Sequence, residues 1–230
     1  QVDAGILLVN GTHAPLANSQ RYTVAGTATL GGTGIIKPFD TTASLTCLTI
    51  SGTLSPGDPL ANNGLGTLTL DGTNSARSLL ALETGAKVQI DLMTDSGGNR
   101  LSDQIAILGA NGSTSDVFFN NTTVNFSDPT GILPAGDYIL FSANAANAFD
   151  SGTINVGTGL DIYSSKTINR SANNIVLTLG AANKDKAIEA LLIVNRALAA
   201  EPALLSASKS PEALDALGRL VSDQYRRGSA

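Results

Sequence analysis

A short phrase that recurs along the first half of the chain does most to limit the folds open to it. Two apolar residues in alternation, followed by Gly-Thr, occur with their glycines at Gly11, Gly26, Gly52 and Gly72. Each copy has the pattern of a short, half-buried β-strand that ends at a glycine turn. The glycines are 15, 26 and 20 residues apart, and a repeat of that order is typical of a solenoid.

The composition agrees with a β-rich fold. Only 14% of the residues are charged and 24 are glycine, whereas a helical bundle or coiled coil would need far more Glu, Lys and Leu. No stretch of about 18 apolar residues occurs, so we expect no membrane insertion by this segment. The net charge is −5. Because phosphate backbones bind clustered Lys and Arg, nucleic acid is not an expected partner.

A change of composition near Gly180 predicts two domains, 1–180 and 181–230. Twelve of the 13 acidic residues before this point are Asp, but three of the six after it are Glu. Glutamate favours helices more than aspartate does. We expect helices over 184–200 and 211–225, the second starting at Ser-Pro. They would form a cap on the repeat domain, or a linker toward a missing C-terminal domain, or a dimer element. A cap would bury four leucines: Leu191, Leu192, Leu214 and Leu217.

The repeat makes a specific structural prediction. The apolar residues Val9, Val24, Ile50 and Leu70 should be buried and stacked in line, with the repeat glycines at corresponding turns. Roughly 175 residues at about 20 per coil would give eight or nine coils. Antiparallel pairing of these phrases would contradict the prediction.

The order of the phrases resembles the autotransporter-associated β-strand repeats, over roughly residues 5–179. The resemblance implies an all-β fold, a right-handed parallel β-helix with a C-terminal α-helical tail or cap, from the passenger of a bacterial outer-membrane autotransporter. It implies a secreted or surface-exposed segment, and no apolar signal segment precedes Gln1. It names no single activity. The matching segments are 7–12, 22–34, 50–57, 65–72, 102–105 and 135–140.

Residue types that hold metals or cofactors are scarce. His13 is the only histidine and Cys47 the only cysteine, so no zinc set and no internal disulfide can be assembled. Cys47 lies in a strand pattern, which predicts a buried, inert thiol. The chain has no Gly-x-Ser-x-Gly elbow, phosphate loop or dinucleotide fingerprint, so we expect no metal and no cofactor.

One triplet is similar to the active-site signature of aspartic peptidases. Asp-Ser-Gly begins at Asp95 and at Asp150, and Asp40-Thr-Thr is a weaker relative. In such enzymes two carboxylates share one proton, so that one activates water while the other polarises the peptide carbonyl. The triplet also suits a tight turn, and the expected coil spacing would separate Asp95 from Asp150 by more than about 8 Å. The turn interpretation is favoured, and a secreted peptidase acting on mucin-like glycoproteins is the alternative.

Two further functions belong to other classes. The one local cluster of charged residues, Asp91, Asp95, Arg100 and Asp103, suggests a carbohydrate-active β-helix, because glycoside hydrolysis needs paired carboxylates. The leading prediction is a structural or adhesin-like segment, since the glycines and apolar pairs are used in building coils. The remaining surface Thr, Ser and Asn suit contact with an extracellular glycan or glycoprotein. The oligomeric state is left open.

Overall fold

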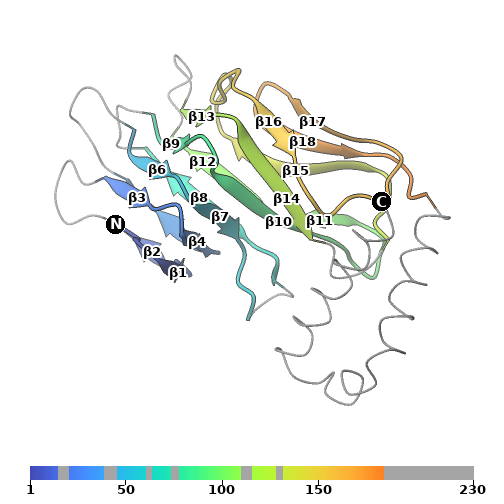
Figure 1. Cartoon of the computed structure of the whole chain (residues 1–230), viewed down its shortest axis with the longest axis horizontal. Coiled ribbons are helices and arrows are strands. Elements are labelled where there is room, and N and C mark those ends of the chain that lie inside the picture. The colour runs from blue at the N-terminus through green and yellow to red at the C-terminus, as the bar shows by residue number, and fades with distance from the viewer. Residues whose placement is uncertain are drawn as a thin grey trace. The chain divides into compact units, whose positions relative to one another are not determined.

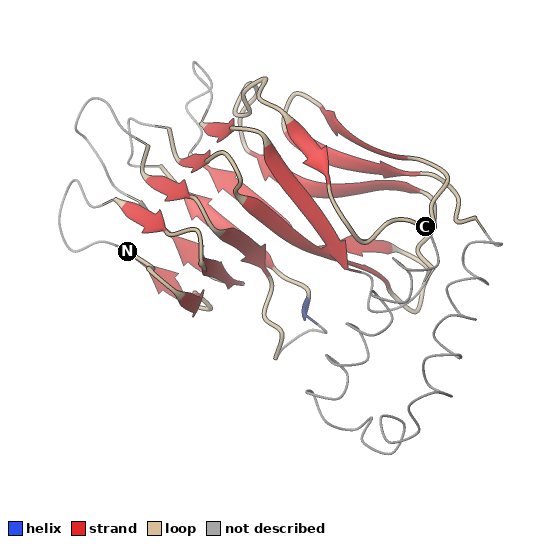
Figure 2. Cartoon of the chain, in the orientation of Figure 1, coloured by secondary structure: helices blue, strands red, loops and turns tan. Residues whose placement is uncertain are grey.

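The computed structural model describes residues 1–14, 21–38, 46–60, 64–73, 78–109, 116–127 and 132–183. The chain divides into two compact units, Gln1–Ala181 and Ala182–Ala230. The first unit is built of β-strands (Figure 2). The helices predicted over 184–200 and 211–225, with their four leucines, lie outside the described residues. Within the described residues, no helix is long and apolar enough to cross a membrane.

The strands of the described residues form three sheets (Figure 1). The first sheet contains, in spatial order, β1 (Gly5–Leu8), β4 (Ala28–Gly32), β7 (Thr53–Pro56), β10 (Lys87–Thr94), β14 (Thr122–Ser127) and β16 (Ile154–Val156), with β11 (Arg100–Ser102) paired to β10. The second contains β2 (Thr12–His13), β5 (Ile35–Ile36), β8 (Thr67–Asp71), β12 (Gln104–Leu108), β15 (Gly136–Ala143), β18 (Asn174–Leu179) and β17 (Lys166–Arg170). The third contains β3 (Tyr22–Val24), β6 (Leu48–Ile50), β9 (Leu80–Leu82) and β13 (Val117–Phe119).

Consecutive strands belong to different sheets in a fixed rotation. The strands β3, β4 and β5 come from the third, first and second sheets, and β6, β7 and β8 repeat that order. The next circuits follow it again, with the β11 excursion inserted between β10 and β12. Within this rotation, strands of successive circuits pair in parallel, because the chain returns to the same sheet only after visiting the other two.

The circuits are longer than the sequence predicts. In the first sheet Thr29 pairs with Thr53, Thr53 with Lys87, and Lys87 with Thr123, so successive partners are 24, 34 and 36 residues apart. The expected 20 residues per coil was therefore wrong, and the first sheet has six strands along its path among the described residues, not eight or nine. The error arises because the four repeat phrases are spread over three sheets and only those at Gly26 and Gly52 share one, so the average spacing of the phrases is not the length of a circuit.

The four apolar residues of the repeat phrases are all buried, as predicted, but they do not form one line. Val24 and Ile50 are register partners in the third sheet. Leu70 pairs with Ile107 in the second sheet, and Val9 follows β1 of the first. Stacking in line was therefore correct for Val24 with Ile50 and wrong for the other two. The phrases that form pairs do so in parallel, as the repeat requires.

The core consists of in-register rows of apolar side chains. In the first sheet the row contains Leu30, Leu54, Val88 and Val124, which are 3% exposed or less. Burying each such side chain contributes about 1.5–3 kcal/mol. Side chains alternate between the two faces of a strand, so every second residue is left facing outward. Cys47 is fully buried, as its strand pattern predicts.

The second sheet ends in a different arrangement. Strand β18 pairs antiparallel with β15 on one side and with β17 on the other. A short connection joins β17 to β18, which is permitted because antiparallel strands need no crossover. The parallel stacking of the second sheet therefore stops at β15, and β17 forms its edge.

The crowding of one repeat glycine yields a stability prediction. A Cβ atom at Gly52 would lie 2.2 Å from the carbonyl oxygens of both Ala25 and Ala28, whereas at Gly26 the nearest atom would be 3.8 Å away. We expect Gly52→Ala to lower the free energy of unfolding by about 1–3 kcal/mol, the usual effect of overpacking. Gly26→Ala should change it by less than about 1 kcal/mol. Urea denaturation followed by circular dichroism measures both, and equal effects would contradict the observed packing.

Candidate functional site

Two members of the predicted charged cluster meet at a junction of several strands. Asp91 lies on β10, directly beside Ser127 of the parallel strand β14. Asp103 is the single residue that separates β11 from β12. We call Asp91, Asp103 and Ser127 the acidic junction. It forms because the β10–β11 hairpin turns the chain back, so that residue 103 returns to the level of residue 91.

The carboxyl group of Asp103 is bound on both oxygens by backbone amides. Its Oδ1 accepts the N–H of Gly66 at 2.7 Å, and its Oδ2 accepts the N–H of Asp91 at 3.0 Å. Its own N–H donates to the Asp91 carbonyl at 2.8 Å. The side chain is 1% exposed. One buried carboxyl thus links β10, the residue after β11, and the segment that leads into β8.

The electrostatic setting of the junction is unusual for an aspartate. Burial raises the pKa of the Asp103 carboxyl to about 7, and the neighbouring Asp91 carboxylate adds to the shift. The two amide donors act in the opposite direction, because they favour the charged form. Asp91 is held through its Oδ1 by the hydroxyl of Ser127.

Two glycines from the segment between β7 and β8 pack against the two carboxyls. A Cβ atom at Gly57 would lie 2.8 Å from Oδ1 of Asp103, and one at Gly64 would lie 2.8 Å from Oδ2 of Asp91. Both glycines also have positive φ, 95° and 90°, where other side chains are strained. Gly57 and Gly64 therefore lie directly against the two carboxyls. A substrate cannot reach Asp103 in this conformation, so its chemistry is that of a structural acid.

Asp95 of the first Asp-Ser-Gly triplet lies in the turn of the β10–β11 hairpin. Its Oδ1 accepts the N–H groups of Gly97 and Asn99, both at 2.8 Å, and its Oδ2 accepts the side-chain amide of Asn99 at 2.8 Å. These contacts, led by the Asn99 side chain, lower the pKa of the Asp95 carboxyl below its usual range. Asp95 thus has the role of a turn residue.

Asp150 of the second triplet binds an edge of the third sheet. Its Oδ1 accepts the N–H of Phe119 at 3.1 Å, on β13. The preceding residue, Phe149, forms a parallel bridge with Val117 of the same strand. Asp150 therefore supplies an acceptor where β13 has no full strand beside it. No hydrogen bond or ion pair joins Asp95 to Asp150 in the part of the chain that the structure describes, and Asp40 lies outside that part.

Arg100, the basic member of the predicted cluster, points to backbone carbonyls. Its Nη1 donates to Ala135 at 3.1 Å and its Nε to Asp137 at 3.2 Å. Ser102 of the same strand donates its hydroxyl to the Ile139 carbonyl at 2.7 Å. These contacts attach β11 to β15. Across the described ranges, Arg100 forms no ion pair with Asp91, Asp95 or Asp103.

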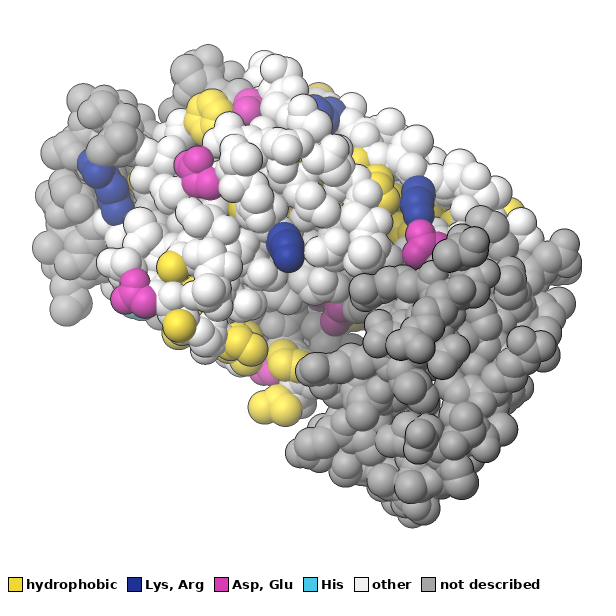
Figure 3. Space-filling view, in the orientation of Figure 1, with side chains coloured by type: hydrophobic (Ala, Val, Ile, Leu, Met, Phe, Trp, Pro, Cys, Tyr) yellow, Lys and Arg dark blue, Asp and Glu magenta, His cyan; other side chains and the backbone are white. Residues whose placement is uncertain are grey.

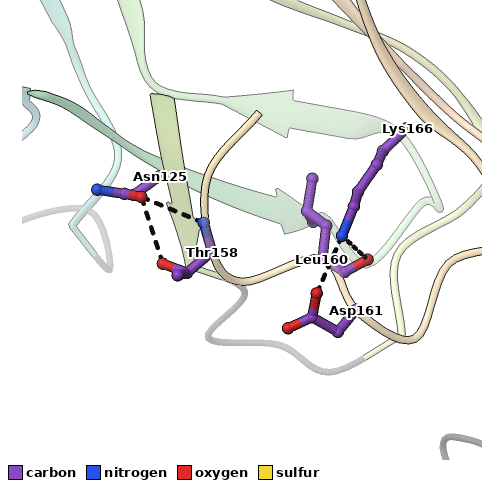
Figure 4. A network of polar contacts seen from close by, with 5 residues as sticks. All are labelled: Asn125, Thr158, Leu160, Asp161 and Lys166. Carbon is purple, nitrogen blue, oxygen red and sulfur yellow. Dashed lines mark hydrogen bonds and ion pairs between the residues drawn. The ribbon is translucent and has the colours of Figure 1, made fainter. Parts of the chain in front are cut away.

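A second group of polar contacts joins the last circuits (Figure 4). Oδ1 of Asn125, on β14, accepts the backbone N–H of Thr158 at 3.2 Å and its hydroxyl at 3.3 Å. Nearby, the Lys166 ammonium donates to the Leu160 carbonyl at 3.3 Å and to Asp161 at 3.0 Å. The first set of contacts holds the loop after β16 to β14, and the second holds it to β17, so both sets have a structural role.

The described residues contain no group of three or more His, Cys, Asp or Glu side chains that could hold a metal ion. His13 is exposed and meets Tyr22 edge to face, with ring centroids 5.4 Å apart. Comparisons of the chain with models of known protein families, with curated proteins and with solved structures found no match.

The contacts of the two Asp-Ser-Gly aspartates generate a prediction. Asp150→Ala removes the acceptor of a strand amide, so it should lower the free energy of unfolding by about 1–3 kcal/mol, while Asp150→Asn should keep most of the stability. Asp95→Ala should instead leave global stability nearly unchanged and speed hydrogen exchange at Gly97 and Asn99. Urea denaturation and exchange measured by NMR test both expectations. An Asp150→Ala variant as stable as the wild type would contradict the assigned role.

Proposed function

We propose that residues 1–180 form a right-handed parallel β-helix that serves as a rigid, surface-exposed structural or adhesin-like segment of a bacterial outer-membrane autotransporter passenger. The observation that carries this proposal is the rotation of the chain through three sheets with parallel register between circuits. Right-handedness follows from the strong preference of parallel crossovers for that hand. The repeat phrases and their order support the family assignment.

The outward face of the first sheet supports a role in contact. One in-register row on this face consists of threonines, a lysine and an asparagine. Each of these side chains lies one position along its strand from a buried or half-buried apolar residue, so it points to the opposite face of the sheet. In Figure 3 the surface over β7, β10 and β14 is mostly white, the colour of the backbone and of side chains that are neither hydrophobic nor charged. Hydroxyl and amide groups at the strand spacing of about 4.8 Å suit hydrogen bonding to a hydroxyl-rich extracellular glycan. The row contains Thr29, Thr53, Lys87, Thr123 and Asn155.

A binding experiment tests the adhesin-like function. The full chain is applied to an array of extracellular glycans and mucin glycopeptides, together with the double variant Thr53→Val/Thr123→Val. We expect the double variant to lose at least about tenfold in affinity, since each removed hydroxyl eliminates one hydrogen bond of about 1 kcal/mol. Thr23→Val, on the exposed face of the third sheet, is the matched control and should bind normally. Absence of binding to every glycan would count against the adhesin-like role.

A cleavage experiment separates this function from the peptidase alternative. Because Asp95 and Asp150 are each bound to different backbone groups, we expect no cleavage of casein or mucin by the full chain between pH 3 and pH 8. Pepstatin and a chelator serve as inhibitor controls. Cleavage that disappears in the Asp95→Asn/Asp150→Asn double variant would establish the peptidase and overturn the proposed function.

A further inference from the structure

Asp103 is the point where three segments of the first unit are tied together. Its side chain binds the N–H of Gly66, which precedes β8, and the N–H of Asp91 on β10. The adjacent Gln104 N–H donates to the Gly66 carbonyl at 3.0 Å. We infer that Asp103 is a pH-sensitive clamp, whose charge sets how firmly the β10–β11 hairpin and the β7–β8 connection are held against the sheets. This inference goes beyond the proposed function and does not depend on it.

Within the described part of the chain, no cation faces the carboxylate of Asp103. From β10 it faces the carboxyl of Asp91, whose other contact is the neutral hydroxyl of Ser127 on β14. From the β7–β8 connection it faces glycine backbone, and the acid of that connection, Asp58, instead binds Asn10 at 2.7 Å. On β11, Arg100 is bound to carbonyls of the strand β15 region. Ionisation of Asp103 therefore places a second negative charge beside Asp91 in a site from which water is excluded.

The direction of the pH effect follows from the folded and unfolded states. The pKa of Asp103 is about 7 in the fold and 3.8 in the unfolded chain. The folded state therefore holds a proton that the unfolded state has lost between these values. Its contribution to stability is complete below about pH 4 and is lost as the pH rises through about 7. Asp95 and Asp71 have lowered pKa values, so they change charge in the fold only below this window.

The part of the fold that responds should be the hairpin. Strand β11 pairs only with β10 in the described residues, over the three pairs from Leu92–Ser102 to Thr94–Arg100. Beyond these pairs it is attached to β15 by the Arg100 and Ser102 side chains. Loosening of the hairpin should leave the pairing of β10 with β7 and β14 intact. At Lys87, which precedes the hairpin in the sequence, β10 pairs with Thr53 on one side and Thr123 on the other.

Urea denaturation of the full chain at pH 5, 6, 7 and 8 tests the clamp. We compare the equilibrium constant for unfolding of the wild type with that of Asp103→Asn at each pH. Their ratio should rise by up to about tenfold for each pH unit between pH 5 and 7. The Asp103→Asn variant has no titrating group at position 103. Its side-chain NH₂ replaces one of the two oxygens that accept a backbone N–H, so two hydrogen-bond donors then oppose each other. It should therefore be less stable than the wild type at pH 5, with the difference shrinking toward pH 8. Asp137→Asn, at an exposed acid on β15, should keep the wild-type pH dependence.

A second variant keeps the test decisive if Asp103→Asn fails to fold. Asp91→Asn leaves both amide donors of Asp103 in place but removes the neighbouring charge, so the pH-dependent loss of stability should move to lower pH. Hydrogen exchange, corrected for intrinsic rates, should show Asp91 and Gln104 amides opening more as the pH rises from 5 to 8 in the wild type. Identical pH dependence in the wild type and Asp103→Asn, or no displacement in Asp91→Asn, would overturn the clamp. Neither result involves a glycan, so the proposed function stands or falls separately.

Discussion

Parallel pairing between residues that are 23 to 37 apart in the sequence is the constraint on which the rest of the first unit depends. A parallel neighbour can be reached only through a crossover, and here each crossover is itself made of strands in the other two sheets. The apolar rows can stack only if every circuit keeps the same register. A slip by one residue would turn a buried row such as Leu30, Leu54 and Val88 outward.

This constraint explains why polar residues gather at the places where circuits differ in length. The extra residues of the longer circuits leave the sheets, and their backbone amides need acceptors other than a strand. Asp103 and Asn125 supply a side-chain oxygen to such amides, those of Gly66 and Thr158, while Asp150 supplies one to the amide of Phe119 on β13. Among the described residues, the carboxyls of Asp103 and Asp150 thus accept backbone N–H groups in place of a strand carbonyl.

Local pattern was sufficient to predict the β-strands, the parallel pairing of the repeat phrases and the turn at Asp95, because alternation and turn chemistry are properties of a few adjacent residues. The antiparallel pairing of β11, β17 and β18 was not predicted. The circuit length could not be predicted, since one phrase can occupy any of the three sheets; Val24 and Leu70 carry similar phrases and lie on different ones. The cluster of Asp91 and Asp103 was visible in the sequence. The burial of Asp103 was not, because it depends on Gly66, 37 residues earlier, whose backbone N–H binds its carboxyl.

The β10–β11 hairpin has a consequence for engineering. Residues 96–99 at its tip are exposed, while the ladders on both sides of β10 are set by residues before the tip. The entropy of closing a loop grows only with the logarithm of its length, so doubling such a loop costs about 0.6 kcal/mol. A foreign peptide inserted at this tip would therefore be carried on a stiff support without disturbing the register of the sheets, which makes the hairpin a site for display.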